Sequence, residues 1–113
     1  MKKMLIIIFL ITTMFADIDL TKKGEIIFKK LNCHICHKID DDAASIGPSI
    51  TTIATHYLGN ERRLVKFLKG EAKPIIDPAR FEIMKPQLYK TKHMTFDEYR
   101  ALSYYLTNFH KNR

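Results

Sequence analysis

Apolar residues recur three and four positions apart along most of the chain. In residues 19–32 they alternate with lysines, a pattern typical of an amphipathic helix with one apolar face. The same spacing predicts short helices over residues 49–57 and 61–69, followed by Gly59 and Gly70, and glycine is the usual residue just past a helix end. No stretch alternates as a strand would. The pattern therefore predicts an all-α domain.

The clearest amphipathic pattern lies near the C-terminus. Thr95 and Glu98 form the sequence signature of a capping box, in which each side chain satisfies a backbone N–H at a helix start. The apolar positions that follow share one helical face; they are Tyr99, Leu102, Tyr105, Leu106 and Phe109.

Residues 71–94 are predicted to be a loop, because Pro74, Pro78 and Pro86 interrupt them. Within this stretch, only residues 79–84 suggest a short helical turn. A loop of this length inside a small domain needs a reason. Wrapping one side of a cofactor would be such a reason.

The N-terminus has the layout of a secretory signal peptide. Two lysines precede an uninterrupted apolar run over residues 4–11, which is well short of the ~20 residues that cross a bilayer. We expect cleavage after Ala16, which divides the chain into a signal peptide (residues 1–16) and a mature domain (residues 17–113). The alternative is an uncleaved membrane anchor over residues 4–16.

Composition bounds the remaining possibilities. The chain has 113 residues, a formal net charge of +7 and two cysteines. The positive charge is mild and forms no basic stripe, so nucleic-acid binding is not predicted. This charge would attract an acidic partner or an anionic membrane surface, or would simply keep the protein in solution. A domain this small usually needs a staple or a cofactor, and two cysteines do not make a disulfide framework.

The candidate chemistry lies in the sequence Cys33-His34-Ile35-Cys36-His37. Two cysteines three apart and an immediate histidine are the pattern of a c-type haem attachment site. On a helical turn both sulfurs share a face, so they can form thioether bonds along one porphyrin edge while His37 turns to the iron.

Three other interpretations of the cysteine pair are weaker. A disulfide between Cys33 and Cys36 would close a tiny loop and constrain the unfolded chain little. A thioredoxin-like redox pair expects a βαβ context that the sequence lacks. A zinc site needs about four ligands, and no second pair with suitable spacing exists.

Taken together, these features resemble the class I cytochromes c, in particular the small monohaem cytochromes of bacterial periplasms. The resemblance covers essentially the whole mature chain. Its residues are Gly24 and Phe28, the motif at 33–37, Gly47-Pro48, Ile53, Ala54 and Tyr57, Met84 beside Pro86, and Leu102, Tyr105 and Leu106.

The resemblance implies a cytochrome c fold, with several helices wrapped around one covalently attached haem c and the N- and C-terminal helices crossing. Gly24 and Phe28 would then lie against Leu102 and Tyr105. The missing Cβ of Gly24 would permit the close approach of the two helices.

The resemblance also implies the site residues. Cys33 and Cys36 would bond the haem, and His37 would be the proximal iron ligand. The carbonyl of Pro48 would accept a hydrogen bond from the other ring nitrogen of His37, which orients the ring and raises its basicity.

For the sixth ligand the resemblance favours Met84, which precedes Pro86 by two residues. Met94 is the alternative, although its place directly before Thr95 suits a hydrophobic staple of the last helix. Ligation by His93 would require a different fold of the loop.

The implied function is that of a periplasmic one-electron carrier rather than an enzyme. The carrier would be a monomer that docks briefly on redox proteins such as a membrane oxidase, a reductase or a peroxidase. One alternative is a haem subunit of a larger oxidoreductase. Another is a five-coordinate haem enzyme or sensor of peroxide or gases, if Met84 does not bind. The lysines expected to steer docking are Lys38, Lys85, Lys90 and Lys92.

Overall fold

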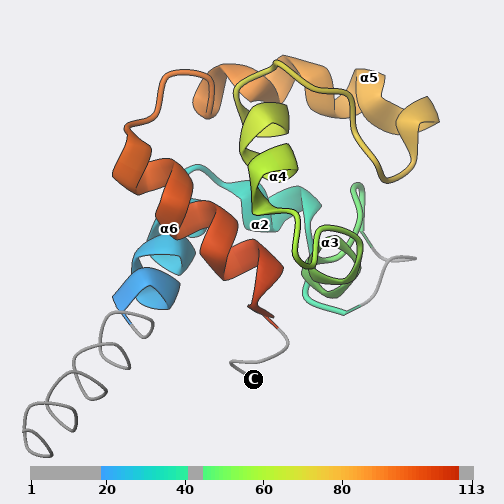
Figure 1. Cartoon of the computed structure of the whole chain (residues 1–113). Coiled ribbons are helices and arrows are strands. Elements are labelled where there is room, and N and C mark those ends of the chain that lie inside the picture. The colour runs from blue at the N-terminus through green and yellow to red at the C-terminus, as the bar shows by residue number, and fades with distance from the viewer. Residues whose placement is uncertain (1–18, 41–44, 110–113) are drawn as a thin grey trace, which may run out of the picture.

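The computed structural model describes residues 19–40 and 45–109, and every regular element among them is helical (Figure 1). The predicted all-α class is therefore confirmed. The predicted signal peptide and its cleavage site lie outside the described residues. A first helix covers residues 19–30 of the described chain. The other elements are α2 (Cys33–Cys36), α3 (Ile50–His56), α4 (Glu61–Leu68), the 3-10 helix η2 (Pro78–Arg80), α5 (Phe81–Met84), the 3-10 helix η3 (Lys85–Lys90) and α6 (Phe96–Thr107).

The start of α6 has the predicted capping box. The Glu98 backbone N–H donates to Thr95 Oγ1 at 3.2 Å, and the Thr95 N–H donates to Glu98 Oε1 at 2.9 Å. Two N–H groups that a helix start leaves unpaired are satisfied in this way.

The first helix crosses α6, as expected (Figure 1). A Cβ added to Gly24 would overlap the carbonyl oxygen of Ala101 and the Cβ of Tyr105. One turn further on, the rings of Phe28 and Tyr105 pack with their centroids 5.6 Å apart. The absence of a side chain at Gly24 is therefore what lets the two backbones meet.

A hydrophobic core joins these two helices to α3 and α4. Its members are nearly all at helical spacing in the sequence, so the amphipathic faces predicted above are the buried ones. They are Phe28, Ile50, Ile53, Tyr57, Leu64, Leu68, Tyr99, Leu102, Tyr105 and Leu106.

Within the long loop predicted over residues 71–94, the short helical turn expected at residues 79–84 is confirmed, but the prediction of loop was wrong for residues 85–90. Residues 78–90 are continuously helical, as η2, α5 and η3 in succession. Two of the three prolines that suggested a loop, Pro78 and Pro86, stand at the first position of η2 and the second position of η3, where a helix needs no N–H from them. They start these helices rather than interrupt them.

Residues 77–92, hereafter the Met84 segment, are anchored at their C-terminal end. The hydroxyl of Thr91 donates to the carbonyl of Leu68 at 2.7 Å, and the hydroxyl of Tyr99 donates to the carbonyl of Thr91 at 2.6 Å. Thr91 is buried. These bonds tie the segment to the end of α4 and to α6.

Within the described residues, no helix has both the length and the apolar composition needed to cross a bilayer.

Candidate functional site

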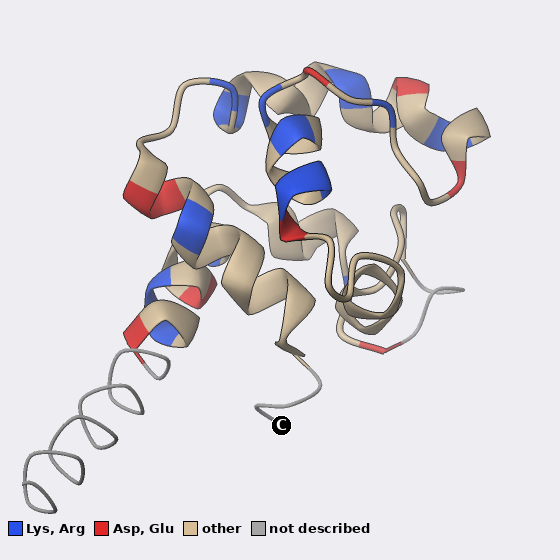
Figure 2. Ribbon diagram, in the orientation of Figure 1, with Lys and Arg blue, Asp and Glu red and all other residues tan. Residues whose placement is uncertain are grey.

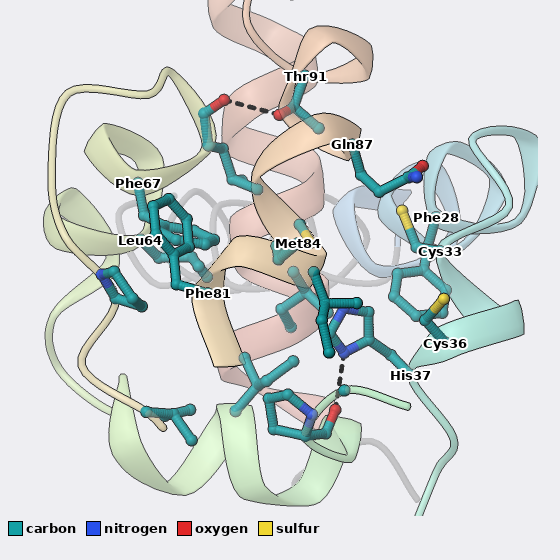
Figure 3. Close-up of a pocket in the computed structure, with 18 of the residues that line it drawn as sticks. Phe28, Cys33, Cys36, His37, Leu64, Phe67, Phe81, Met84, Gln87 and Thr91 are labelled. Atoms are coloured by element: carbon teal, nitrogen blue, oxygen red, sulfur yellow. Dashed lines mark hydrogen bonds between the residues drawn. The ribbon is translucent and has the colours of Figure 1, made fainter. Parts of the chain in front are cut away.

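A deep cleft opens between the Met84 segment and the rest of the fold (Figure 3). The empty space in and around it, open solvent at its mouth included, is about 1210 Å³. The walls are mainly apolar, and they come from the first helix, α3, α4 and α6 as well as the Met84 segment. Phe28, Ile53, Leu64, Phe67 and Leu102 are among the lining residues. A concave apolar pocket of this kind is where a large, mostly apolar ligand binds.

The two cysteines line the same part of the cleft wall. α2 is a single helical turn, so residues three apart share a face, and Figure 3 shows Cys33 and Cys36 next to each other. Both are free thiols and half-buried. Burial raises the pKa of the Cys33 thiol, and the positive charge of Lys90 opposes that rise. Burial therefore favours the neutral thiol of Cys33, and Cys36 lines the same apolar cleft beside it.

His37 follows α2 directly, and its ring is held from two sides. Its Nδ1 donates to the carbonyl oxygen of Pro48 at 2.7 Å (Figure 3). Gly47 packs against the ring, where a Cβ would stand 2.7 Å from Cε1. The bond to Pro48 fixes the proton on Nδ1, because a carbonyl oxygen only accepts. The other ring nitrogen, Nε2, keeps its lone pair.

Burial also favours the neutral form of this ring. Desolvation lowers the pKa of His37, while the hydrogen bond to Pro48 acts in the opposite direction. A neutral imidazole is the form that binds a metal. His37 is thus both oriented and in the protonation state that ligation requires.

The 46–48 loop that contacts His37 is tied back to the motif at 33–37 and the residue after it. The N–H of Gly47 donates to the carbonyl of Cys36 at 2.8 Å. The N–H of Lys38 donates to the hydroxyl of Ser45 at 3.1 Å. These two bonds join the residues on either side of His37 to residues 45 and 47. They therefore fix the position of the neighbouring Pro48 carbonyl relative to the His37 ring.

The two candidate methionines lie in different surroundings. Met84, the last residue of α5, is partly buried and lines the same cleft as His37 (Figure 3). Met94 is not among the lining residues; it packs against the hydrophobic core. The fold therefore brings Met84, and not Met94, into one cleft with the motif at 33–37.

The other described histidines stand outside the cleft. His34, His56 and His93 are exposed, and none lines it. The Nδ1 of His56 lies 2.9 Å from the carbonyl oxygen of Thr52 in its own helix. Among the described residues, no cluster of three or more His, Cys, Asp or Glu side chains is arranged to hold a metal ion.

Sequence reasoning did not place two cationic residues in the cleft: Arg80 was not singled out, and Lys90 was expected only to steer docking. Arg80 lines it and donates a hydrogen bond to the carbonyl of Ile46. Lys90 also lines it, and its ammonium donates to the carbonyl of Leu31 at 3.0 Å. Isolated basic residues in a proline-containing stretch carry no local signal of such a role, since their carbonyl partners lie 34 and 59 residues away in the chain.

The residues of the cleft fit a haem that is bonded to the chain. Two thiols lie at one edge, a neutral imidazole presents its free nitrogen, a thioether lies in the same cleft, and the walls are apolar. Fold and cleft together define an all-helical haem protein. The family model for cytochrome c matches residues 21–109, so the chain belongs to the cytochrome c family. A search of curated proteins found no match. The protein is accordingly a haem-binding electron-transfer protein that carries covalently bound haem c.

Proposed function

We propose that the protein is a one-electron carrier of the periplasm, with a single haem whose iron is ligated by His37 and Met84. The observation that carries this proposal is that both side chains line one cleft, together with the two cysteines. When bound, the haem supplies the one-electron iron couple. The chain supplies the attachment, the axial ligands and the apolar walls.

The surroundings of His37 support its role as the proximal ligand. Because Nδ1 is engaged by Pro48, the ring cannot rotate without losing that bond. The same bond makes Nε2 a stronger donor to the metal. If both ligands stay in place, the protein would need little structural reorganisation when it gains or loses an electron.

The surroundings of Met84 support its role as the sixth ligand. A thioether is uncharged at every pH and is a soft ligand that raises the reduction potential of haem iron. Apolar side chains beside it, such as Phe67 and Phe81, line the same cleft and pack on each other with ring centroids 5.8 Å apart. These rings make part of the cleft wall near Met84 apolar.

For partners, we propose redox proteins with an acidic docking surface. A second hollow lies between residues 70–73 and the Met84 segment. It is lined by Lys73, Lys85 and Lys92 and by a single carboxylate, that of Glu71. Phe81 lines both this hollow and the main cleft. Figure 2 shows basic residues along α4 and the Met84 segment. Such a charge distribution speeds encounter with an acidic partner without requiring a large interface.

Lys90 does not belong to this docking set. Its ammonium is bonded to the carbonyl of Leu31, and its side chain is partly buried in the cleft wall. Of the four lysines expected from the sequence to steer docking, Lys38, Lys85 and Lys92 are exposed.

The periplasmic location rests on the N-terminal sequence, which has the basic end and short apolar run of a signal peptide. Haem attachment to a CxxCH motif and export are compatible with each other, provided that both thiols stay reduced until the haem arrives, since exported cysteines otherwise tend to form disulfides.

The test is spectroscopic. The exported protein is produced in a host competent in haem attachment, and a pyridine haemochrome assay measures haem bound per chain, with one expected. The reduced protein is then exposed to carbon monoxide as wild type, as Met84→Ala and as Met94→Ala. We expect the spectrum to change little in wild type and in Met94→Ala, and to change fully in Met84→Ala, where the sixth position is open.

Three results would contradict the proposal. A colourless protein would exclude haem attachment at Cys33 and Cys36. A wild-type protein that takes up carbon monoxide as readily as Met84→Ala would instead indicate a five-coordinate haem enzyme or sensor. A large protein that co-purifies in fixed ratio would indicate a haem subunit of an oxidoreductase.

A further inference from the structure

We propose that Arg80 is a positioning residue that couples the position of Met84 to the position of the His37 ring. Its hydrogen bond to the carbonyl of Ile46 holds the helical turn that ends in Met84 against the 46–48 loop that orients His37. The inference rests on the proposed ligation of the iron by His37 and Met84.

On one side, Arg80 is linked to Met84 through a single turn of helix. Arg80 caps α5, and Met84 is its last residue. Residues four apart share a helical face, and both side chains line the cleft. A displacement of Arg80 therefore moves the backbone from which Met84 projects.

On the other side, three consecutive residues connect Arg80 to the His37 ring. The carbonyl of Ile46 accepts from Arg80, Gly47 packs against the imidazole, and the carbonyl of Pro48 accepts from Nδ1. The Ile46 carbonyl and the Pro48 carbonyl are thus only two residues apart. A shift at the first is transmitted to the second through a short, hydrogen-bonded loop.

The two ends of the Met84 segment are attached to the fold in different ways, and the position of the N-terminal end depends on Arg80. At the C-terminal end, Thr91 is buried and is bonded to Leu68 and to Tyr99, and Lys90 is bonded to Leu31. At the N-terminal end, the link to the 46–48 loop is the guanidinium of Arg80, whose side chain is 50 % exposed. Met84 lies between these two attachments.

An arginine suits this position better than a lysine. Its guanidinium has a planar fork of donors, so one side chain can serve two acceptors at once. Here Nη2 donates to Ile46, while Nη1 lies 3.6 Å from the carboxylate of Asp77. Asp77 itself has a positive φ of 43° at the start of η2, and the ion pair orients the guanidinium from within its own segment.

The experiment compares three variants of the haem-loaded protein with wild type: Arg80→Gln, Arg80→Lys and the matched control Arg62→Gln. Arg62 is an exposed arginine of α4 that does not line the cleft, so its substitution removes the same charge. The readouts are the near-infrared charge-transfer absorption of ferric thioether-ligated haem, its disappearance as pH is raised, and carbon monoxide uptake by the reduced protein. Far-UV circular dichroism establishes that each variant is folded.

In Arg80→Gln we expect about a tenfold larger share of molecules with an open sixth position, which is the effect of losing one hydrogen bond from a half-exposed cation. Carbon monoxide uptake should rise accordingly, and the charge-transfer absorption should disappear at lower pH. Arg80→Lys should lie between Arg80→Gln and wild type, and Arg62→Gln should match wild type.

The outcomes separate this inference from the proposed function. Wild-type behaviour of Arg80→Gln in all three readouts, or equal changes in Arg80→Gln and Arg62→Gln, would overturn the role of Arg80 and leave His37/Met84 ligation intact. A wild-type protein that lacks the charge-transfer absorption and binds carbon monoxide freely would overturn both.

Discussion

The backbone of Gly47 lies against the imidazole of His37, so closely that a Cβ at Gly47 would stand 2.7 Å from Cε1 and 3.1 Å from Nδ1. The contact lies directly beside the bond between His37 and Pro48. The glycine is therefore needed for space at the ring rather than for an unusual backbone conformation, because the positive-φ glycines of the described chain are Gly59 and Gly70.

Gly47→Ala should therefore disturb the ligand as well as the fold. The added methyl group has to push the ring away from Pro48, at a cost of about 1–3 kcal/mol in the free energy of unfolding, as for overpacking elsewhere. The midpoint potential of the haem should shift too, since the Pro48 bond tunes the ligand. Chemical unfolding and a redox titration of the haem-loaded protein measure the two effects.

The matched control is Gly59→Ala. Gly59 has φ 75°, but an added Cβ there would point into open space, with nothing to meet within 4 Å. Alanine at this position costs only the left-handed conformation, about 1–2 kcal/mol. Its midpoint potential should stay that of wild type. Equal potentials in Gly47→Ala and wild type would contradict the steric role of Gly47.

A second prediction concerns the crossing of the first helix and α6. Gly24→Ala would force a methyl group into the Ala101 carbonyl and the Tyr105 Cβ, and neither can move without separating the helices. We expect a loss of about 3 kcal/mol, seen as a lower urea midpoint with an unchanged slope. Ile26→Ala, on the same helix but at a residue 63 % exposed, should change stability by no more than about 0.5 kcal/mol.

A third prediction is a pH dependence of stability from the capping box. Hydrogen bonds from the Thr95 backbone and side chain lower the pKa of Glu98 in the folded protein. A lowered folded pKa means that the ionised carboxylate stabilises the fold above its unfolded pKa, and that this contribution is lost as pH falls through the folded pKa. Unfolding free energies measured from neutral to acidic pH should therefore converge for wild type and Glu98→Gln at low pH.

Glu98→Gln keeps a side chain that can cap the helix but removes the titrating group. It should be less stable than wild type at neutral pH. If the gap between the two proteins were the same at neutral and acidic pH, the assignment of this contribution to Glu98 would fail.

A fourth prediction concerns the lysines behind the Met84 segment. The double variant Lys85→Gln/Lys92→Gln should slow electron transfer to an acidic redox partner severalfold at low ionic strength, because it weakens steering. The difference should vanish near 1 M salt, where charges are screened beyond about 3 Å. Stopped-flow rates over a salt series measure it.

Lys23→Gln/Lys29→Gln is the control for that experiment. These lysines pair with Asp19 and Glu25 on the first helix, at 3.3 and 2.9 Å. The control therefore removes the same charge at a site distant from the hollow that Lys85 and Lys92 line. Equal slowing by both double variants would indicate a general effect of net charge.

A fifth prediction concerns processing. Expressed with its own N-terminus, the protein should be recovered from the periplasm, and its mass should correspond to a chain that begins at Asp17 plus one haem. Recovery of the full-length chain from the membrane fraction would indicate instead the uncleaved anchor over residues 4–16.

The motif at 33–37 and the helices that flank it could be predicted from the sequence because their signals are local. Cys33 and Cys36 are one turn apart, and the apolar face of residues 95–109 is continuous. The crossing of Gly24 with Tyr105 and the bond between His37 and Pro48 were expected only through the family resemblance, since no local rule relates residues so far apart.

The sequence indicated a helical turn over residues 79–84, but the helical character of residues 85–90 could not be predicted in the same way. Three short helices, two of them 3-10 turns with a proline at their first or second position, have little stability alone. They persist because Thr91, Tyr99 and Arg80 attach them to other parts of the fold. Their sequence therefore resembles that of a loop.

By itself, then, the sequence determined the covalent chemistry: two thiols and an imidazole on one turn, and the order of amphipathic helices around them. The tertiary structure decided which methionine shares the cleft with His37, and which cations hold the cleft together. The physical reason is the range of the interactions. Helix periodicity and the CxxCH spacing act over a few residues, whereas Arg80 and Lys90 bond to carbonyls 34 and 59 residues away, a proximity that only the packed fold creates.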